Sequence, residues 1–189
     1  MRTTTLLIAC ALPLAACDNK ADVHASNASV NEVAAKVRAA AGKEALVRPG
    51  EWQSNITIEE MTIPGMSPEV QEQMKKVMKS EQTHSFKTCI TEADVKRPKE
   101  DFFAGKNNEC RYDHFTMAGG KIDAVMHCSD KRGGQAMRIT GTYAAESYDV
   151  RMEMKGQGDE AGENMSMKTH TVAHRIGECS AAELADRKE

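Results

Sequence analysis

Methionines at alternating positions are the residues of this sequence whose type and spacing could do chemistry. Neighbouring expected strands place six of them on one face: Met126, Met137, Met152, Met154, Met165 and Met167. Successive strand residues point to opposite faces, so each alternating pair shares a side. Thioethers bind Cu(I), but methionine also fills apolar cores and adaptable binding surfaces. Three interpretations stay open: a packed core, the lining of a groove for an apolar ligand or partner, and a copper site.

No other residue set predicts a reaction. The sequence lacks a Gly-x-Ser-x-Gly turn, a Walker loop and a His-Glu-x-x-His motif. His170 and His174 share an expected strand face, but four strand residues separate them by about 13 Å, too far to hold one metal alone. We therefore predict a noncatalytic protein, with no catalytic residue, no metal site and no cofactor.

Four cysteines lie in the expected domain. Cys110 and Cys128 flank the turn signal Gly119-Gly120, which places them opposite each other in a hairpin and leaves Cys89 with Cys179. An even number of cysteines in an exported chain favours disulfides. Zinc is the rival interpretation, although no C-x₂-C spacing is present. We predict the bridges Cys110–Cys128 and Cys89–Cys179.

The first residues predict export. Arg2 precedes an apolar run that is shorter than the roughly 20 residues of a membrane span, and small residues follow it. Leu14-Ala15-Ala16-Cys17 resembles the lipobox of bacterial lipoproteins, which implies cleavage before Cys17 and its acylation, with palmitate as one such chain. Ordinary cleavage near Ala16 is the alternative. We expect a lipid-anchored protein of the bacterial envelope that faces the periplasm, on either membrane.

The domain boundaries follow from composition. We predict a signal peptide over 1–16, then the lipidated cysteine, a tether and a short helix over 17–47. A disulfide-stapled β domain over 48–180 and a polar tail over 181–189 complete the chain. The tether covers 18–28, and a capping box from Ser29 to Glu32 begins the helix. Whether that helix packs on the domain is left open. The formal net charge of −3 argues against nucleic acid as a partner.

An amphipathic helix is inserted between two early strands. Ser67 is a suitable N-cap and Pro68 suits the first turn. One stripe of this helix is apolar and contains Val70, Met74, Val77 and Met78. The stripe fits either a docked core helix or a mobile lid or contact surface. Trp52, the only tryptophan, fits either the core or a ligand platform.

From Cys110 onward, alternating strands and short turns predict a meander. The fold class is mainly β: an antiparallel curved meander or open barrel-like sheet with one inserted amphipathic helix and a short N-terminal helix. Pairing about the turns predicts six opposed pairs: Tyr112 with Met126, Thr116 with Ile122, Tyr143 with Tyr148, Gly141 with Val150, Met152 with Met167, and Met154 with Met165.

Several motifs together resemble a proteobacterial exported lipoprotein family that is catalogued only as a domain of unknown function. They are RPGEW, KTCITEAD, the NNEC to GGKIDAVMHC hairpin, the Gly-Thr-Tyr and Ser-Tyr-Asp strands, and HRIGEC, over residues 48–179. The resemblance implies a four-cysteine framework in one continuous domain and supplies no activity.

We therefore expect an envelope lipoprotein that binds an apolar small molecule, a lipid or a protein partner. The candidate surface comprises Trp52, Val70, Met74, Val77, Met78, Met152, Met154, Met165 and Met167. A structural spacer or assembly component is the alternative.

Overall fold

The computed structural model describes residues 22–41, 46–80, 83–96, 110–130, 133–158 and 164–186. The predicted signal peptide, Cys17 and most of the charged loop over 96–108 lie outside these ranges. So does most of the acidic loop that follows residue 158.

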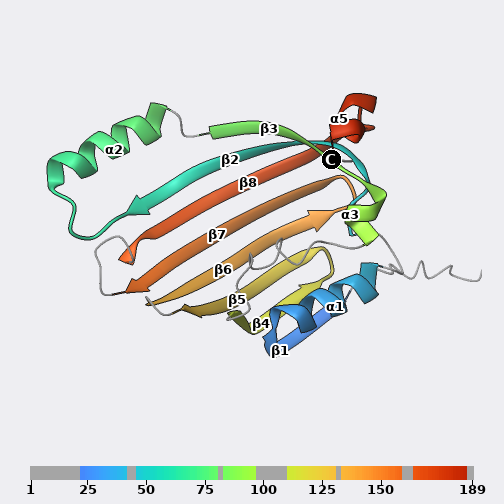
Figure 1. Ribbon diagram of the computed structural model, residues 1–189, viewed down its shortest axis with the longest axis horizontal. Coiled ribbons are helices and arrows are strands. Elements are labelled where there is room, and N and C mark those ends of the chain that lie inside the picture. Colours follow the sequence, from blue (N-terminus) through green and yellow to red (C-terminus); the bar gives the residue numbers. More distant parts are fainter. Residues whose placement is uncertain are drawn as a thin grey trace, which may run out of the picture.

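Eight strands form one antiparallel sheet in the order β1-β4-β5-β6-β7-β8-β2-β3 (Figure 1). The strands are β1 (Val23–Ser29), β2 (Gly50–Thr62), β3 (Thr83–Ile90), β4 (Cys110–Ala118), β5 (Lys121–Asp130), β6 (Gly133–Ala144), β7 (Ser147–Gly158) and β8 (Ser166–Gly177). The predicted mainly β, antiparallel fold is confirmed. The sheet is open rather than a closed barrel, because β1 and β3 are its two outer strands.

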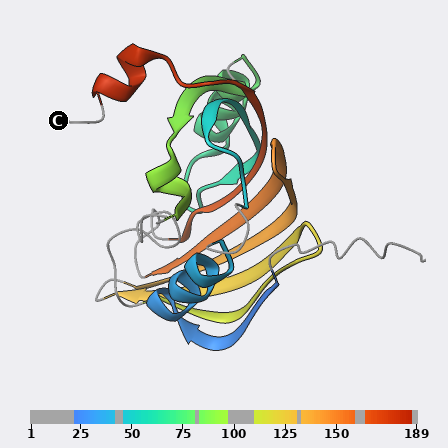
Figure 2. The same ribbon diagram turned by 90° about the vertical axis from the view of Figure 1, so that its right-hand side faces the viewer.

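The sheet curves strongly, and α1 (Val30–Ala41) and α3 (Glu92–Lys96) lie on the inside of the curve (Figure 2). The other described helices are α2 (Pro68–Ser80) and α5 (Ala181–Asp186). α1 follows one outer strand, α3 follows the other, and the two helices touch each other. They therefore connect the two edges of the sheet across one end of its concave face.

Residues 23–41 belong to this fold. The expected tether over 18–28 is wrong from Val23 onward, because β1 pairs with β4 along its length. The predicted capping box is confirmed: the Ser29 amide donates to Glu32 Oε2 at 2.6 Å, and the Glu32 amide donates to Ser29 Oγ at 3.3 Å. Val33 and Val37 are buried against the sheet, so α1 is part of the core. Likewise, the predicted polar tail contains α5.

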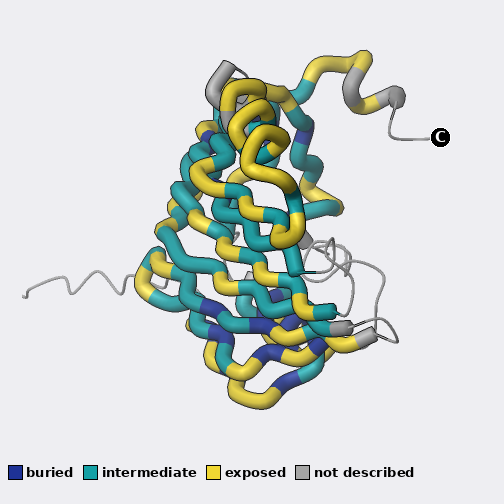
Figure 3. Tube along the Cα trace, turned by 90° about the vertical axis from the view of Figure 1, so that its left-hand side faces the viewer, coloured by how far each residue is buried: buried dark blue, intermediate teal, exposed yellow. Residues whose placement is uncertain are grey.

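The core is concentrated at the β1–β4–β5 side of the sheet, where α1 covers it (Figure 3). Tyr112 and Phe115 lie beneath α1 with their rings in an edge-to-face contact, centroids 5.3 Å apart. Burial raises the pKa of the Tyr112 hydroxyl to about 12. Apolar packing is therefore densest at one end of the curve and decreases toward β8 and β2.

Close approach of two central strands accompanies the curvature. Gly141 of β6 lies opposite Val150 of β7, as predicted. A side-chain carbon at Gly141 would collide with the carbonyl oxygen of Asp149 and would lie 2.8 Å from the Val150 Cα. Only glycine allows the two backbones to come this close at that position.

Two turns change the predicted registers, and a bulge offsets one of these changes. Ala118 pairs with Lys121 across the two-residue turn Gly119-Gly120, so Met117, not Thr116, is the partner of Ile122. A bulge at Asp113 then offsets this one-residue difference, and Cys110 faces Cys128 and Tyr112 faces Met126, as predicted.

The β7–β8 register is displaced by two residues. Met154 faces Met167, and Met152 faces Thr169, so both predicted methionine pairings are wrong although the shared face is right. Asn164 supplies the reason, because its side chain donates to the Gly158 carbonyl at 2.7 Å and accepts from the Gly158 amide at 3.4 Å. This amide side chain continues the hairpin past the last paired residues, so the turn is centred later than the sequence suggested.

Candidate functional site: the concave sheet face

The two faces of the sheet differ sharply in charge. Directly opposed residues share a face, and away from the strand ends the registers place no Asp, Glu, Lys or Arg residue on the concave face of the described strands β4 to β8 and β2; Arg175 and Asp130 lie near the ends of β8 and β5. The concave surface is therefore suited to apolar groups and poorly suited to ions.

A row of methionines crosses this concave face. Met61 lies opposite Met167, Met167 opposite Met154, Met154 opposite Met137, and Met137 opposite Met126. These five residues, here called the Met row, come from β2, β8, β7, β6 and β5. With about 4.8 Å between strands, the row is about 19 Å long. It offers a continuous thioether and methylene surface perpendicular to the strands.

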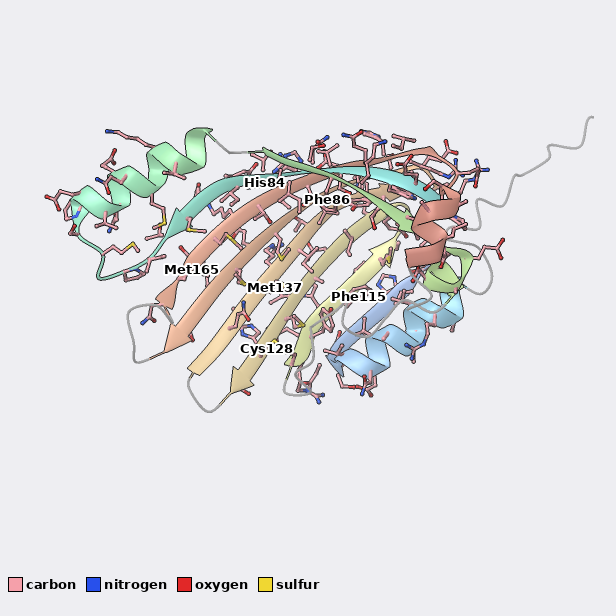
Figure 4. The ribbon with its side chains drawn as sticks, turned by 45° about the horizontal axis from the view of Figure 1, so that its top comes forward. His84, Phe86, Phe115, Cys128, Met137 and Met165 are labelled. Atoms are coloured by element: carbon pink, nitrogen blue, oxygen red, sulfur yellow. A yellow bond between two sulfur atoms is a disulfide. The ribbon has the colours of Figure 1, made fainter. Side chains whose placement is uncertain are left out.

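Burial changes along the Met row. Met126 is 1% exposed and belongs to the core beneath α1, and Met137 packs against that core. Met154, Met167 and Met61 are half-buried and lie outside the core cluster. In Figure 4, Met137 lies in the middle of the sheet, with Met165 toward α2 and Phe115 toward α1. The row thus begins under one helix and ends, partly uncovered, near the base of another.

A second apolar row runs beside the first. Ile58, Thr169, Met152, Ile139, Ala124 and Phe115 are successive partners across the same strands. Thr169 and Ala124 have short side chains. On β8 and β5 the side chains of the Met row therefore extend farther from the sheet than those of the second row. The long, unbranched side chains of the Met row can change rotamer to fit different apolar shapes.

α2 lies beside the uncovered end of the Met row and is not docked. Its first turn is capped as predicted, with the Val70 amide donating to Ser67 Oγ at 3.4 Å. Val70 is 45% exposed and Val77 is 60% exposed. Within the described residues, α2 makes no extensive contact with another helix or strand. The docked core helix, one of the two sequence interpretations, is therefore not the observed arrangement.

The opposite, convex face carries cross-strand ion pairs. Lys168 Nζ lies 2.8 Å from Glu60 Oε2, and this hydrogen bond raises the pKa of the lysine. Arg138 contacts Asp123 at 3.1 Å, and His170 Nε2 lies 2.8 Å from Asp149 Oδ1. The side chains of these six residues are at least one-fifth exposed, so the pairs give solubility and register more than stability.

Trp52 lies in the core and not on an accessible surface. It is 0% exposed, it stacks on Tyr148 with the ring centroids 5.7 Å apart, and its Nε1 donates to the Arg48 carbonyl at 3.0 Å. The core interpretation of Trp52 is confirmed, and its assignment to a ligand surface is corrected. The Tyr148 hydroxyl lies 3.2 Å from Ser54 Oγ, so the polar groups of this cluster are paired.

The motifs RPGEW and HRIGEC meet in the structure. Arg175 Nε donates to the Pro49 carbonyl at 2.7 Å, and the Arg48 amide donates to the Ala145 carbonyl at 2.7 Å. Gly50 has φ of +142°, and a side chain there would collide with the Gly177 carbonyl. These motifs hold the ends of β2 and β8 together, which is a structural role.

Both predicted disulfides are present. Cys110–Cys128 joins β4 to β5, and Cys89–Cys179 joins β3 to the segment after β8. The first lies on the concave face at one end of the sheet, and the second fastens the β3 edge.

Apart from Trp52, the candidate residues that the structure describes form two groups. Met152, Met154, Met165 and Met167 are brought together on the concave face, and Val70, Met74 and Val77 form the α2 stripe beside it. The Met78 side chain lies outside the described part of the structure.

Met61 is a concave-face residue that the sequence did not predict, because strict alternation from Trp52 puts an odd-numbered residue on the other face. A register shift between Ile58 and Glu60 turns Met61 to the concave face. No residue type in that segment predicts the shift.

Histidines and acidic residues form no metal centre in the described ranges, where no group of three His, Cys, Asp or Glu has a suitable arrangement. Arg111 lies opposite His127, and Val125 lies opposite His114, so these two histidines are not paired across the hairpin. Among the described helices, none has the length and apolar character to cross a membrane.

Comparison with known proteins identifies a family but no activity. Residues 47–179 match the model of a family described as "Protein of unknown function (DUF3617)". Neither the curated proteins nor the solved structures gave a significant match.

Proposed function

Because the chain belongs to the DUF3617 family, whose function is unknown, we propose from the geometry alone that it binds an alkyl chain on the concave sheet face. The ligand is an apolar small molecule or a lipid, and the protein acts without catalysis as an envelope lipoprotein anchored through Cys17. One observation carries this proposal: the Met row crosses five strands, and four of its five members are half-buried.

The energetics favour a long chain. Each methylene removed from water contributes about 0.8 kcal/mol, whereas association costs several kcal/mol of lost freedom. A short chain therefore gains little, and a chain that extends along the row of about 19 Å gains enough to bind. Affinity should rise with chain length among fatty acids that share the same carboxylate.

A spacer function is less well supported. A protein that serves only as a spacer or assembly component gains stability from a concave face that is fully packed. Here Met137, Met154 and Met167 keep part of their surface in solvent, and the neighbouring amphipathic helix leaves its apolar stripe exposed. Surface of this kind is retained at a cost in solubility, which favours a binding role.

The direct test is displacement of a dansylated undecanoic acid, whose fluorescence rises in an apolar site, from the full-length protein prepared without free detergent. Met154→Lys should weaken binding at least about tenfold, because a lysine on the row buries an unpaired charge against the chain. Gln157→Lys is the matched control, since Gln157 is exposed on the same strand and faces the other side. Equal effects of the two lysines would refute the proposal.

A second variant separates apolar binding from thioether chemistry. Met154→Leu keeps the volume and apolar character but removes the sulfur, so fatty-acid binding should stay within about threefold of the wild type. If the row instead served as a Cu(I) site, Met154→Leu would lose copper binding. The dansyl probe would then have no specific site on the wild type either.

A further inference from the structure

The α2 stripe is apolar surface that is largely exposed to solvent in the observed arrangement. Val70 and Val77 are 45% and 60% exposed, and Met74 is half-buried. The three residues lie on one side of α2 within about 10 Å along its axis. A helix of this length is marginally stable alone and gains most of its stability from packing. The stripe therefore has a partner surface in at least one state of the protein.

The nearest candidate for that surface belongs to the same chain. Met61, the last residue of the Met row, is separated from the start of α2 at Pro68 only by Thr62 and a five-residue connection, 63–67. Gly65 in that connection has φ of +85°, a conformation that glycine adopts without strain. The connection can extend to about 17 Å, so rotation at this point can bring the stripe over the adjacent end of the row.

We propose that α2 is a lid that closes over an alkyl chain bound on the Met row, so that Val70, Met74 and Val77 form the second wall of the site. This inference rests on the proposed function. While α2 is open, an alkyl chain on the sheet keeps its outer side in water, and the α2 stripe is exposed as well. Closure removes both surfaces from water in one movement, which links the position of α2 to the presence of the chain.

Cysteine accessibility tests the closure. Val77→Cys and Lys76→Cys place a single added thiol on the stripe and on the other side of the same helix. The full-length variants are treated with a maleimide reagent with and without palmitate, and wild-type protein corrects for any reaction at other cysteines. Palmitate should slow the labelling of Val77→Cys at least about tenfold and leave Lys76→Cys unchanged, because only the stripe side becomes covered.

A second variant tests the same movement through its effect on palmitate affinity. Val77 is 60% exposed, so Val77→Asp should leave the melting temperature unchanged. The same substitution puts a charge into the closed site and should weaken palmitate binding about tenfold. Lys76→Asp is the matched control and should bind as the wild type does.

The outcomes separate the lid from the site it covers. If palmitate binds in a manner that depends on Met154 but protects neither thiol, the lid is refuted, the proposed function stands, and the stripe is left for a protein partner. A maleimide labelling rate of Val77→Cys that is the same with and without palmitate also refutes closure on ligand binding. If Met154→Lys and Gln157→Lys bind equally, the proposed function fails, and the lid fails with it.

Discussion

Met61 of β2 lies directly opposite Met167 of β8, at the end of the Met row that approaches α2. The pairing connects two parts of the molecule with different character. In one direction the row passes beneath α1 into a dense core, and in the other it reaches the connection to an undocked helix. The same sheet face is thus both the interior of the domain and a surface that an apolar chain can reach.

The close approach of β6 and β7 predicts a strong effect at Gly141. Gly141→Ala should lower the free energy of unfolding by about 1–3 kcal/mol, because the added carbon collides with the Asp149 carbonyl. Gly134→Ala in the same strand is the control, since its added carbon meets its nearest neighbour at an ordinary 3.5 Å. Denaturant unfolding measures both, and equal losses would show that the strands can separate without cost.

Tyr112 predicts a loss of stability at alkaline pH. An unfolded tyrosine ionises near pH 10, whereas burial raises the pKa of folded Tyr112 to about 12. Between these values the unfolded chain loses the proton and the folded chain keeps it, so stability falls as pH rises. The loss is about 2–3 kcal/mol by pH 12. Tyr112→Phe should remove this part of the fall, measured by unfolding between pH 9 and pH 12, while Tyr143→Phe should keep it.

The two disulfides predict unequal contributions. Their cysteines are 90 residues apart for Cys89–Cys179 and 18 residues apart for Cys110–Cys128. On the loop-entropy model, replacing both cysteines by serine should cost about 4–5 kcal/mol for the first bridge and about 3 kcal/mol for the second. Peptide mapping without reduction should first find these two linkages. A larger loss at the hairpin bridge would contradict the ranking.

Lipid attachment at Cys17 is tested independently of the fold. Cys17→Ser should abolish labelling by a fatty-acid analogue in cells and release the protein from the membrane fraction. Labelling that persists in the variant would contradict the anchor. Because Cys17 precedes β1 in the sequence, the variant should keep the unfolding transition of the wild type.

Much of the fold was predictable because local rules agree with the tertiary structure. Alternation placed Met137, Met154 and Met167 on one face, and Gly119-Gly120 predicted the turn of the β4–β5 hairpin. The capping sequences at Ser29 and Ser67 predicted where two helices begin. Each of these signals extends over a few residues and needs no information from distant parts of the chain.

The remaining features depend on contacts between distant segments. Val23–Ser29 is rich in small and polar residues, and it becomes a strand only because β4 offers a free edge. The bulges at Asp113 and after Ile58 carry no sequence signal, yet they decide which residues face Cys128 and Met167. The position of α2 is likewise unpredictable, because an apolar stripe fits a docked and an undocked helix equally well.

Mapping a photoactivatable palmitate onto the protein tests alkyl-chain binding most directly. The full-length protein is irradiated with a diazirine-bearing palmitate, and the modified residues are located by tandem mass spectrometry. We predict insertion at Met154, Met167 and Met61, lost when unlabelled palmitate is in excess, with Glu153 and Lys155 of the convex face unmodified. Insertion spread equally over both faces, or insertion that excess palmitate does not reduce, would contradict binding on the Met row.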